Sequence, residues 1–328
     1  MGITSERPQH MAPVYDSYFA DPFVWKHLDT YYAIGTGELE ANGRTTGNIF
    51  PILRTSDLIN WQPLDNALVR PDPRLGNHFW APAVAFCDGR FYLYYSVGHE
   101  DKRHQLRVAT SDSPQGPYID CGKPLLDLAL CSFAIDPHPF QDADNQWYLF
   151  YAKDFLDRTD NARAGTGLAV AKMRGMTCLE PKETVILRAR SDWQRFQSPR
   201  LMYGGIWDWH TLEGPCIHKH HDQYYCFYSG GRWETENYGV DYGIADNVLG
   251  PYSDAGNELG PRVLRTIPGR LIGPGHNSII RGPDERTDYV VFHAWNQQMT
   301  RRVMHIAPLV WTQAGPRIDS LEAFTKLS

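Results

Sequence analysis

Short apolar stretches alternate with polar turns along the whole chain, and they recur in one fixed order. Each copy begins with a polar or small residue beside a proline or glycine, continues as an apolar strand, turns, and returns as an aromatic strand. In the first copy, residues 20–25 read ADPFVW, residues 27–29 form the turn and residues 30–34 read TYYAI. Further copies start at residues 81, 136, 213 and 276, so the starts are 55 to 77 residues apart.

This repeated order predicts antiparallel β-sheet modules. A turn rich in Asp and Gly between two aromatic or β-branched stretches indicates a hairpin, because these residues tolerate the backbone angles of tight turns. Each hairpin is followed by a third strand signal, as at residues 53–61, 108–113 and 243–246, and helical periodicity is nearly absent. Five such units predict one all-β domain over residues 1–328, a five-bladed β-propeller. Two packed β-sandwich domains would not repeat the order so regularly.

Composition supports a packed globular protein and narrows its partners. Hydrophobic residues make up 42% of the chain and aromatic residues 13%, with 10 Trp and 18 Tyr. Aromatic rings suit broad sheets as well as sugar-binding surfaces, because they offer a flat apolar face. The net charge of −6 argues against a nucleic-acid partner, which selects concentrated positive charge.

Three further features bear on the compartment. No apolar run approaches the roughly 18 residues that cross a bilayer, so we expect no membrane partner. Residues 1–7 lack a basic region followed by an apolar segment, which predicts no signal peptide, although a signal removed earlier is the alternative. The six cysteines are dispersed without a CxxC pair, which is typical of reduced core residues. Together these features favour the cytoplasm, and they leave the oligomeric state open.

The residues that open the five repeats carry the candidate chemistry. In a propeller the innermost strand of each blade lines the central channel, so residues at matching positions converge at one end. These positions are taken as Asp21, Ala81, Asp136, Glu213 and His276. Any one Asp-Pro or Glu-Gly-Pro could merely start a strand or make a turn. Three acids in register instead indicate acid/base chemistry, because clustered carboxylates cannot all ionise and at least one pKa should rise.

At these same residues the chain resembles glycoside hydrolase family 43. The resemblance rests on Ala-Asp-Pro, Trp-Ala-Pro, Ile-Asp-Pro, Glu-Gly-Pro and Gly-His-Asn in that order, and on residues 56–61, SDLINW. It runs from about Tyr18 to Trp311 and implies a five-bladed propeller that hydrolyses glycosides with inversion. It also implies roles: Asp21 as general base, Glu213 as general acid, and Asp136 as the carboxylate that orients the acid and keeps its pKa raised. Inversion predicts that the carboxyl groups of Asp21 and Glu213 lie about 6.5–9.5 Å apart.

The resemblance implies supporting residues as well. Trp80 is expected to wall the sugar site, Ala81 to leave space beside it, and Ile135 to contact substrate, although a blade-packing role is the alternative for Trp80. Arg302 is expected to reach the pocket, while Arg301 beside it is not. Two loops are further candidates for the substrate rim or for inter-blade packing: residues 208–212, which include Trp209, and residues 232–235.

Two metal sites come into question. The resemblance makes His276 the residue on the propeller axis, expected to bind substrate and to lie near a structural Ca²⁺ in the central channel. Imidazole is a poor ligand for this hard cation, so a largely hydrated ion is the expected form, and the chemistry requires no cofactor. The histidines at 218, 220 and 221 bring zinc to mind. We expect no zinc there, because alternating side chains diverge and no Cys or carboxylate is seen to complete the set.

The substrate is expected to be an arabino- or xylo-oligosaccharide. The resemblance covers arabinanases, α-L-arabinofuranosidases and β-xylosidases. Only about 17 residues follow Trp311, which leaves no room for the C-terminal β-sandwich of many β-xylosidases. We therefore expect an exo-acting α-L-arabinofuranosidase, with β-xylosidase or endo-arabinanase as alternatives. A phosphorylase needs a cationic pocket, for which only Arg302 is a candidate, and a fructan hydrolase or a non-catalytic sugar-binding propeller are further alternatives.

Overall fold

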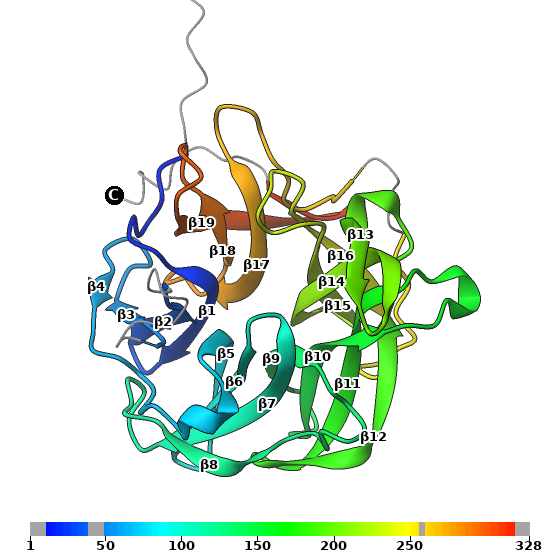
Figure 1. The fold of residues 1–328 in the computed structure, drawn as a ribbon. Coiled ribbons are helices and arrows are strands. Elements are labelled where there is room, and N and C mark those ends of the chain that lie inside the picture. The colour runs from blue at the N-terminus through cyan, green and yellow to red at the C-terminus, as the bar shows by residue number, and fades with distance from the viewer. Residues whose placement is uncertain (1–10, 39–48, 256–259, 319–328) are drawn as a thin grey trace, which may run out of the picture.

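The computed structural model describes residues 11–38, 49–255 and 260–318 (Figure 1). Across these residues the chain forms twenty β-strands, three short 3-10 turns and no α-helix, and no helix could span a membrane. The N-terminal residues 1–7, used above to judge export, lie outside the described residues. The 3-10 turns are η1 (Pro73–Leu75), η2 (Thr159–Asn161) and η3 (Asp192–Gln194).

The first, second and last modules are four-stranded antiparallel sheets whose strands follow chain order. The first contains β1 (Ala20–His27), β2 (Thr30–Thr36), β3 (Ile52–Thr55) and β4 (Gln62–Pro63). The second contains β5 (His78–Cys87), β6 (Arg90–His99), β7 (Lys102–Ser111) and β8 (Ile119–Pro124). The last contains β17 (Ile272–Arg281), β18 (Asp288–Trp295), β19 (Arg302–Thr312) and β20 (Gly315–Ile318).

The third and fourth modules are joined into one eight-stranded sheet. The third contains β9 (Ala134–Gln141), β10 (Trp147–Phe155), β11 (Gly165–Gly175) and β12 (Cys178–Leu187). The fourth contains β13 (Arg195–Met202), β14 (Gly205–His220), β15 (Gln223–Gly230) and β16 (Gly239–Ala245). The sixteen-residue β14 connects them, because its first half pairs with β13 and also runs parallel to β11 at Gly165 and Thr166.

Five hydrophobic clusters lie between successive modules, and they close the ring seen in Figure 1. Four of them join neighbours along the chain. The fifth packs Phe19, Val24 and Tyr31 of the first module against Val291 and Met304 of the last. Each sheet thus buries both faces against its neighbours, which explains the high content of aromatic and β-branched residues. This architecture is the predicted five-bladed β-propeller.

The segment before β1 fastens the ring where its two ends meet. The backbone N–H groups of Val14 and Phe19 donate to the carbonyls of Met304 and Arg302 at 2.9 Å each, and Tyr15 forms an isolated bridge with Met304. These hydrogen bonds add the N-terminal segment to the edge of β19. We call this contact between residues 14–24 and β18–β19 the closing seam.

Each of the five inner strands carries a β-bulge at the same place. The strand register shifts across two unpaired residues, and the first of these has a positive φ: Asp21 (51°), Ala81 (46°), Asp136 (58°), Gly214 (58°) and His276 (48°). The alignment of the five repeats was therefore right except in the fourth. There the bulge begins at Gly214, and Glu213 precedes it as a paired residue opposite Ser229.

Candidate active site

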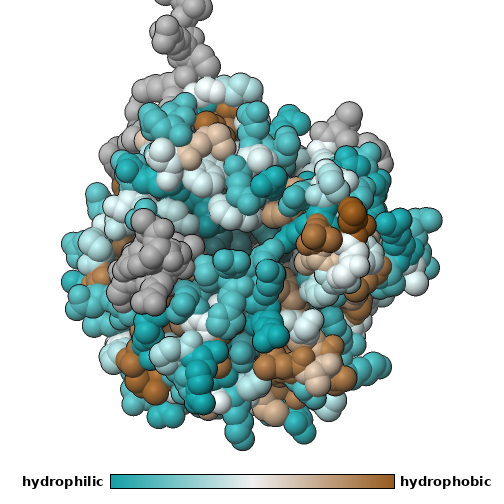
Figure 2. Space-filling model, in the orientation of Figure 1, coloured by the Kyte–Doolittle hydropathy of each residue, from teal (hydrophilic) through white to brown (hydrophobic). Residues whose placement is uncertain are grey.

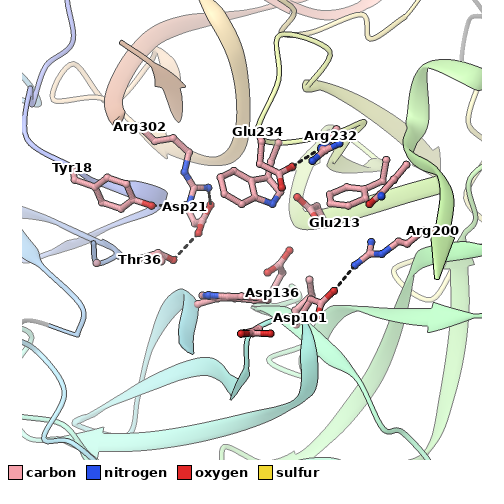
Figure 3. A pocket seen from close by; sticks show the side chains of 17 residues that line it. Tyr18, Asp21, Thr36, Asp101, Asp136, Arg200, Glu213, Arg232, Glu234 and Arg302 are labelled. Atoms are coloured by element: carbon pink, nitrogen blue, oxygen red, sulfur yellow. Dashed lines mark hydrogen bonds and ion pairs between the residues drawn. The ribbon is translucent and has the colours of Figure 1, made fainter. Parts of the chain in front are cut away.

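A pocket of about 480 Å³ opens at the centre of the ring, where Figure 2 shows the hydrophilic face hollowed. Asp21, Asp136 and Glu213 all line it, and Figure 3 shows their carboxylates pointing into the same space from different strands. The bulges explain how two positions per strand reach this space. A bulge re-aims the side chains beside it, so the bulged Asp21 and Asp136 face the pocket together with Trp80, Ile135 and Glu213, which precede their bulges.

Asp21 lies in a cationic environment that favours its ionised form. Its Oδ2 accepts a hydrogen bond from Thr36 Oγ1 at 2.6 Å, and Arg302 Nη1 lies 3.3 Å from its Oδ1. Its backbone N–H donates to Nδ1 of His293 at 3.0 Å. Burial alone would raise the pKa of Asp21, but Arg302, His276 and His293 together hold it well below its usual range. Asp21 is therefore a carboxylate at neutral pH.

Asp136 and Glu213 lie in an environment that favours protonation. Burial raises the pKa of Glu213 to about 7, opposed in part by a hydrogen bond from Tyr238. Burial also raises the pKa of Asp136 well above its usual range, and the nearby charges of Glu213 and Asp21 add to this effect. Asp136 Oδ2 accepts a hydrogen bond from the N–H of Gly214 at 2.8 Å, which ties it to the residue following Glu213.

Tyr238 is a site residue that the sequence did not reveal. Its hydroxyl donates to Glu213 Oε1 at 2.6 Å, and the side chain is 1% exposed. Its ring stacks on His293, which contacts Asp21, with 5.8 Å between the ring centroids and 6° between the planes. A Cβ on Gly275 would lie 2.0 Å from this ring, so glycine is needed there for close packing. Tyr238 thus links the surroundings of the two outer carboxylates.

Arg302 lies where the resemblance implied. It is buried in the pocket wall, donates to the hydroxyl of Tyr18 at 2.8 Å, and its guanidinium lies 4.3 Å from the ring centroid of Trp233. Arg301 points outward and pairs with Asp16 at 3.1 Å. The two neighbouring arginines therefore separate as expected from alternation along a strand.

The other expected substrate-binding residues divide into two groups. Trp80 and Ile135 line the pocket, and Trp80 stacks on the buried His104 at 3.8 Å between ring centroids. Ala81, Trp209 and His276 do not line it. Ala81 is buried and donates its N–H to Thr36 Oγ1 at 2.9 Å, which orients the hydroxyl bonded to Asp21. Trp209 lines a small adjoining cavity of about 80 Å³ that also touches Trp80 and Glu213.

The rim contains two arginines beyond the expected one, so the expectation of a single candidate cation was wrong. Arg200 pairs with Asp101 at 2.9 Å, and Arg232 pairs with Glu234 at 3.1 Å. Arg232 and Glu234 come from the loop that the sequence offered as a substrate rim, whereas Arg200 comes from β13. Each of these arginines is neutralised by its carboxylate. The pocket is therefore not the cationic site that a phosphate group requires.

His276 offers a partial fit to a central cation. Its Nδ1 lies 3.4 Å from Asp21 Oδ1 and 4.0 Å from Asp136 Oδ2. The amide oxygen and nitrogen of the next residue, Asn277, are buried without a hydrogen-bond partner in the described chain. An amide oxygen and nearby carboxylates are donors that suit Ca²⁺, while the imidazole can reach such an ion only through water.

The three histidines at the end of β14 do not behave as expected. His218 and His220 lie on one side of the strand, and Asp288 of β18 brings its carboxylate next to them, so that one ligand atom from each lies within 4.8 Å of the others. The statements that these side chains diverge and that no carboxylate completes the set were therefore wrong. The sequence could not show this, because Asp288 is 68 residues beyond His220.

Comparisons with known proteins agree with this geometry. Residues 11–316 match the family model described as glycosyl hydrolases family 43. The exo-α-(1→5)-L-arabinofuranosidase of Cellvibrio japonicus is 26% identical, over 94% of this chain and 88% of that protein. The β-D-galactofuranosidase of Aspergillus niger is 25% identical, over 89% and 78%. The crystal structure of a thermostable family-43 glycoside hydrolase superposes with a TM-score of 0.76 at 26% identity, over 95% and 96%.

Proposed function

We propose, given that the chain belongs to glycosyl hydrolases family 43, that it removes terminal α-L-arabinofuranose from arabinose-containing oligosaccharides with inversion of configuration. The observation that carries this proposal is the division of protonation states among the carboxylates of one pocket. Asp21 is held ionised by cationic neighbours, while burial raises the pKa of Glu213 to about 7. Acid-catalysed cleavage of a glycosidic bond needs such a pair.

In the proposed reaction both acids act in one displacement. Asp21 takes a proton from a water molecule, whose oxygen forms a bond to the anomeric carbon. Glu213 gives its proton to the glycosidic oxygen as the bond from that oxygen to the anomeric carbon breaks. The reaction leaves Asp21 protonated and Glu213 ionised, and exchange of protons with solvent restores both.

Asp136 and Arg302 maintain these states in the proposal. The raised pKa of Asp136 keeps it near neutrality, so it can share hydrogen bonds with the sugar and with the backbone beside Glu213. Arg302 keeps Asp21 ionised without consuming its reactive oxygens, since only one contact of 3.3 Å joins them. Trp80, held flat by His104, supplies an apolar wall for a sugar ring.

Exo action is supported by the rim. Arg200 of β13 and Asp101 of the turn between β6 and β7 meet at 2.9 Å and join two separate blades beside the pocket. Such a bridge blocks one side of the cavity, whereas endo cleavage needs a groove that continues past the acids. The furanosidases among the relatives favour a five-membered ring as the terminal sugar.

A substrate panel tests the proposal. Hydrolysis rates are compared for p-nitrophenyl α-L-arabinofuranoside, β-D-xylopyranoside and β-D-galactofuranoside, with linear arabinan for endo action. We expect the arabinofuranoside to be cleaved with the highest kcat/KM, and proton NMR of the fresh product to show the inverted anomer. Glu213→Gln is the control, expected to lose about 10²–10⁴ of the rate. Preference for the xyloside, a rapid fall in arabinan viscosity, or retention would each overturn the corresponding part.

A central cation is a separate proposal. A hydrated Ca²⁺ near His276 and the Asn277 amide would stabilise the bulges that carry the acids, without entering the reaction. Adding millimolar Ca²⁺ to protein stripped with a chelator is expected to raise the Tm, and His276→Ala is expected to abolish the rise. An unchanged Tm would contradict this proposal and leave the hydrolase proposal standing.

A further inference from the structure

We propose that His218, His220 and Asp288 form a binding site for a transition-metal ion of the zinc class, which clamps the fourth blade to the fifth. The site lies five to seven residues beyond Glu213 along β14, a distance of roughly 20 Å at the rise of an extended strand. It is therefore separate from the pocket and from the proposed hydrolysis.

The geometry of the three side chains is close to that of a metal site. His218 and His220 are two residues apart, so both imidazoles leave the same side of β14. One ligand atom from each of the three residues lies within 4.8 Å of the others. His218 Nε2 and Asp288 Oδ2 are 3.5 Å apart. Two ligand atoms bound to one tetrahedral Zn²⁺ are separated by about 3.4 Å, since the bonds are about 2.0–2.1 Å long.

Trp311 holds the ligands in place. Its indole stacks on His220, with 3.9 Å between ring centroids and 6° between planes, and on His218, with 5.3 Å and 21°. Its Nε1 donates to Asp288 Oδ2 at 2.9 Å. Hydrogen bonds of this kind to a ligating carboxylate fix its orientation and are a regular part of metal sites. The rings and the carboxylate are thus restrained before any ion arrives.

The donor set selects the class of ion. Two imidazoles and one carboxylate suit Zn²⁺ and similar borderline ions, whereas Ca²⁺ and Mg²⁺ prefer oxygen ligands only. Asp288 is 4% exposed and both histidines are partly exposed, so an ion can enter from solvent while the carboxylate stays shielded. The fourth position is left to water.

Arg281 opposes the ion and gives the site a tunable element. Its Nη2 lies 3.1 Å from Asp288 Oδ1, the oxygen that does not face His218. The guanidinium can remain there when the ion binds, but it repels the second positive charge. Removing this charge should therefore strengthen metal binding, which a purely structural His–Asp contact would not predict.

The ion would join two blades that otherwise meet through an apolar cluster. Both histidines belong to β14 of the fourth blade and Asp288 opens β18 of the fifth. An ion that binds the folded chain alone raises stability by mass action, and at 100 times Kd the gain is about 2.7 kcal/mol.

Isothermal titration calorimetry and thermal unfolding of the metal-free protein test the site, with ZnCl₂ as ligand and CaCl₂ and MgCl₂ as comparisons. We expect one Zn²⁺ per chain, a Tm that rises with Zn²⁺ concentration, and no such rise with equal Ca²⁺ or Mg²⁺. His220→Ala and Asp288→Asn should each weaken Zn²⁺ binding at least tenfold. Arg281→Gln should tighten it several-fold. His99→Ala, which removes an exposed histidine on β6, is the matched control and should leave binding unchanged.

Three outcomes would overturn the proposal: no saturable Zn²⁺ binding by the wild-type chain, binding that persists unweakened in His220→Ala, or Arg281→Gln that binds no tighter. The Tm of each variant without metal is measured first, so that a loss of binding in a variant that still unfolds cooperatively is assigned to the site. Hydrolysis by Asp288→Asn is expected to stay near that of the wild type, which distinguishes failure here from failure of the proposed function.

Discussion

Three carboxylates of similar chemistry reach different protonation states because their neighbours differ. All three are buried, and burial by itself raises the pKa of each. Around Asp21 the charge of Arg302 outweighs burial, whereas around Asp136 the nearby anions add to it. The position of one guanidinium therefore decides which acid can serve as the base.

This division predicts a pH profile. Glu213 must carry its proton, so kcat/KM should fall as the pH rises through its pKa of about 7. Asp21 must be ionised, and its pKa is depressed, so activity should persist down to at least the ordinary pKa of Asp, about 3.9. Measuring kcat/KM from pH 4 to 9 checks both limbs. A rate that keeps rising to pH 9 would exclude Glu213 as the acid.

Tyr238→Phe tests how the acid is tuned. The hydroxyl donates to Glu213 Oε1 and lowers its pKa, so its loss should raise that pKa and move the alkaline limb upward by about one pH unit. We also expect kcat to fall, because the remaining carboxyl is less firmly oriented. Tyr118→Phe, which removes a hydroxyl bonded to the Pro114 carbonyl elsewhere in the ring, is the control. An unmoved limb would assign Tyr238 to packing alone.

At the scale of the element, the β-bulge is the device that builds the site. Proline lacks an N–H, so it fits the unpaired positions of a bulge. Pro22, Pro82, Pro137 and Pro215 all occupy the second unpaired residue. Alignment on the prolines would have shown that Glu213 stands one residue earlier than Asp21 and Asp136. The sequence held this signal, and alignment on the acids obscured it.

Gly214→Ala tests the fourth bulge. Gly214 has a φ of 58°, and a Cβ there would lie 3.2 Å from the imidazole of His276. Alanine should cost about 1–3 kcal/mol of unfolding free energy and should shift the neighbouring Glu213. Urea unfolding and kcat measure the two effects. Gly89→Ala, at an exposed hairpin turn with open space around its Cβ, is expected to destabilise the fold without lowering kcat.

The rim illustrates what patterns along the chain leave out. Arg200 and Asp101 meet across 99 residues of sequence. Neither belongs to a repeated motif, because β13 is an extra strand paired with the long first half of β14. Residues of irregular insertions are placed by tertiary packing, so only the loop at 232–235, adjacent to a repeat, was identified in advance.

At the scale of the molecule, the repeats predicted the number and order of the modules because each hairpin is encoded locally. They could not predict that β14 fuses the third and fourth sheets, nor how the ring closes. Both features depend on pairing between distant segments. The closing seam joins residues more than 250 positions apart, such as Asp21 and His293.

The seam also carries half of the proposed chemistry, which leads to a prediction about how activity is lost on heating. Phe19 is fully buried in the cluster between the first and last blades, and its N–H bonds to the carbonyl of Arg302. Phe19→Ala should cost about 3–5 kcal/mol of unfolding free energy. Because Tyr18, Asp21 and Arg302 flank this cavity, local loosening should disturb the base before the ring unfolds.

We therefore expect Phe19→Ala to lose hydrolysis several degrees below its unfolding midpoint, as measured by activity and circular dichroism on the same heating ramp. Phe91→Ala removes the same side chain from the cluster between the first and second blades, near the hairpin turn that precedes β6. It should lower the Tm by a similar amount, yet keep activity until the fold is lost. If both variants lose activity and fold together, closure and catalysis are coupled only through global stability, and the seam has no separate role in holding Asp21.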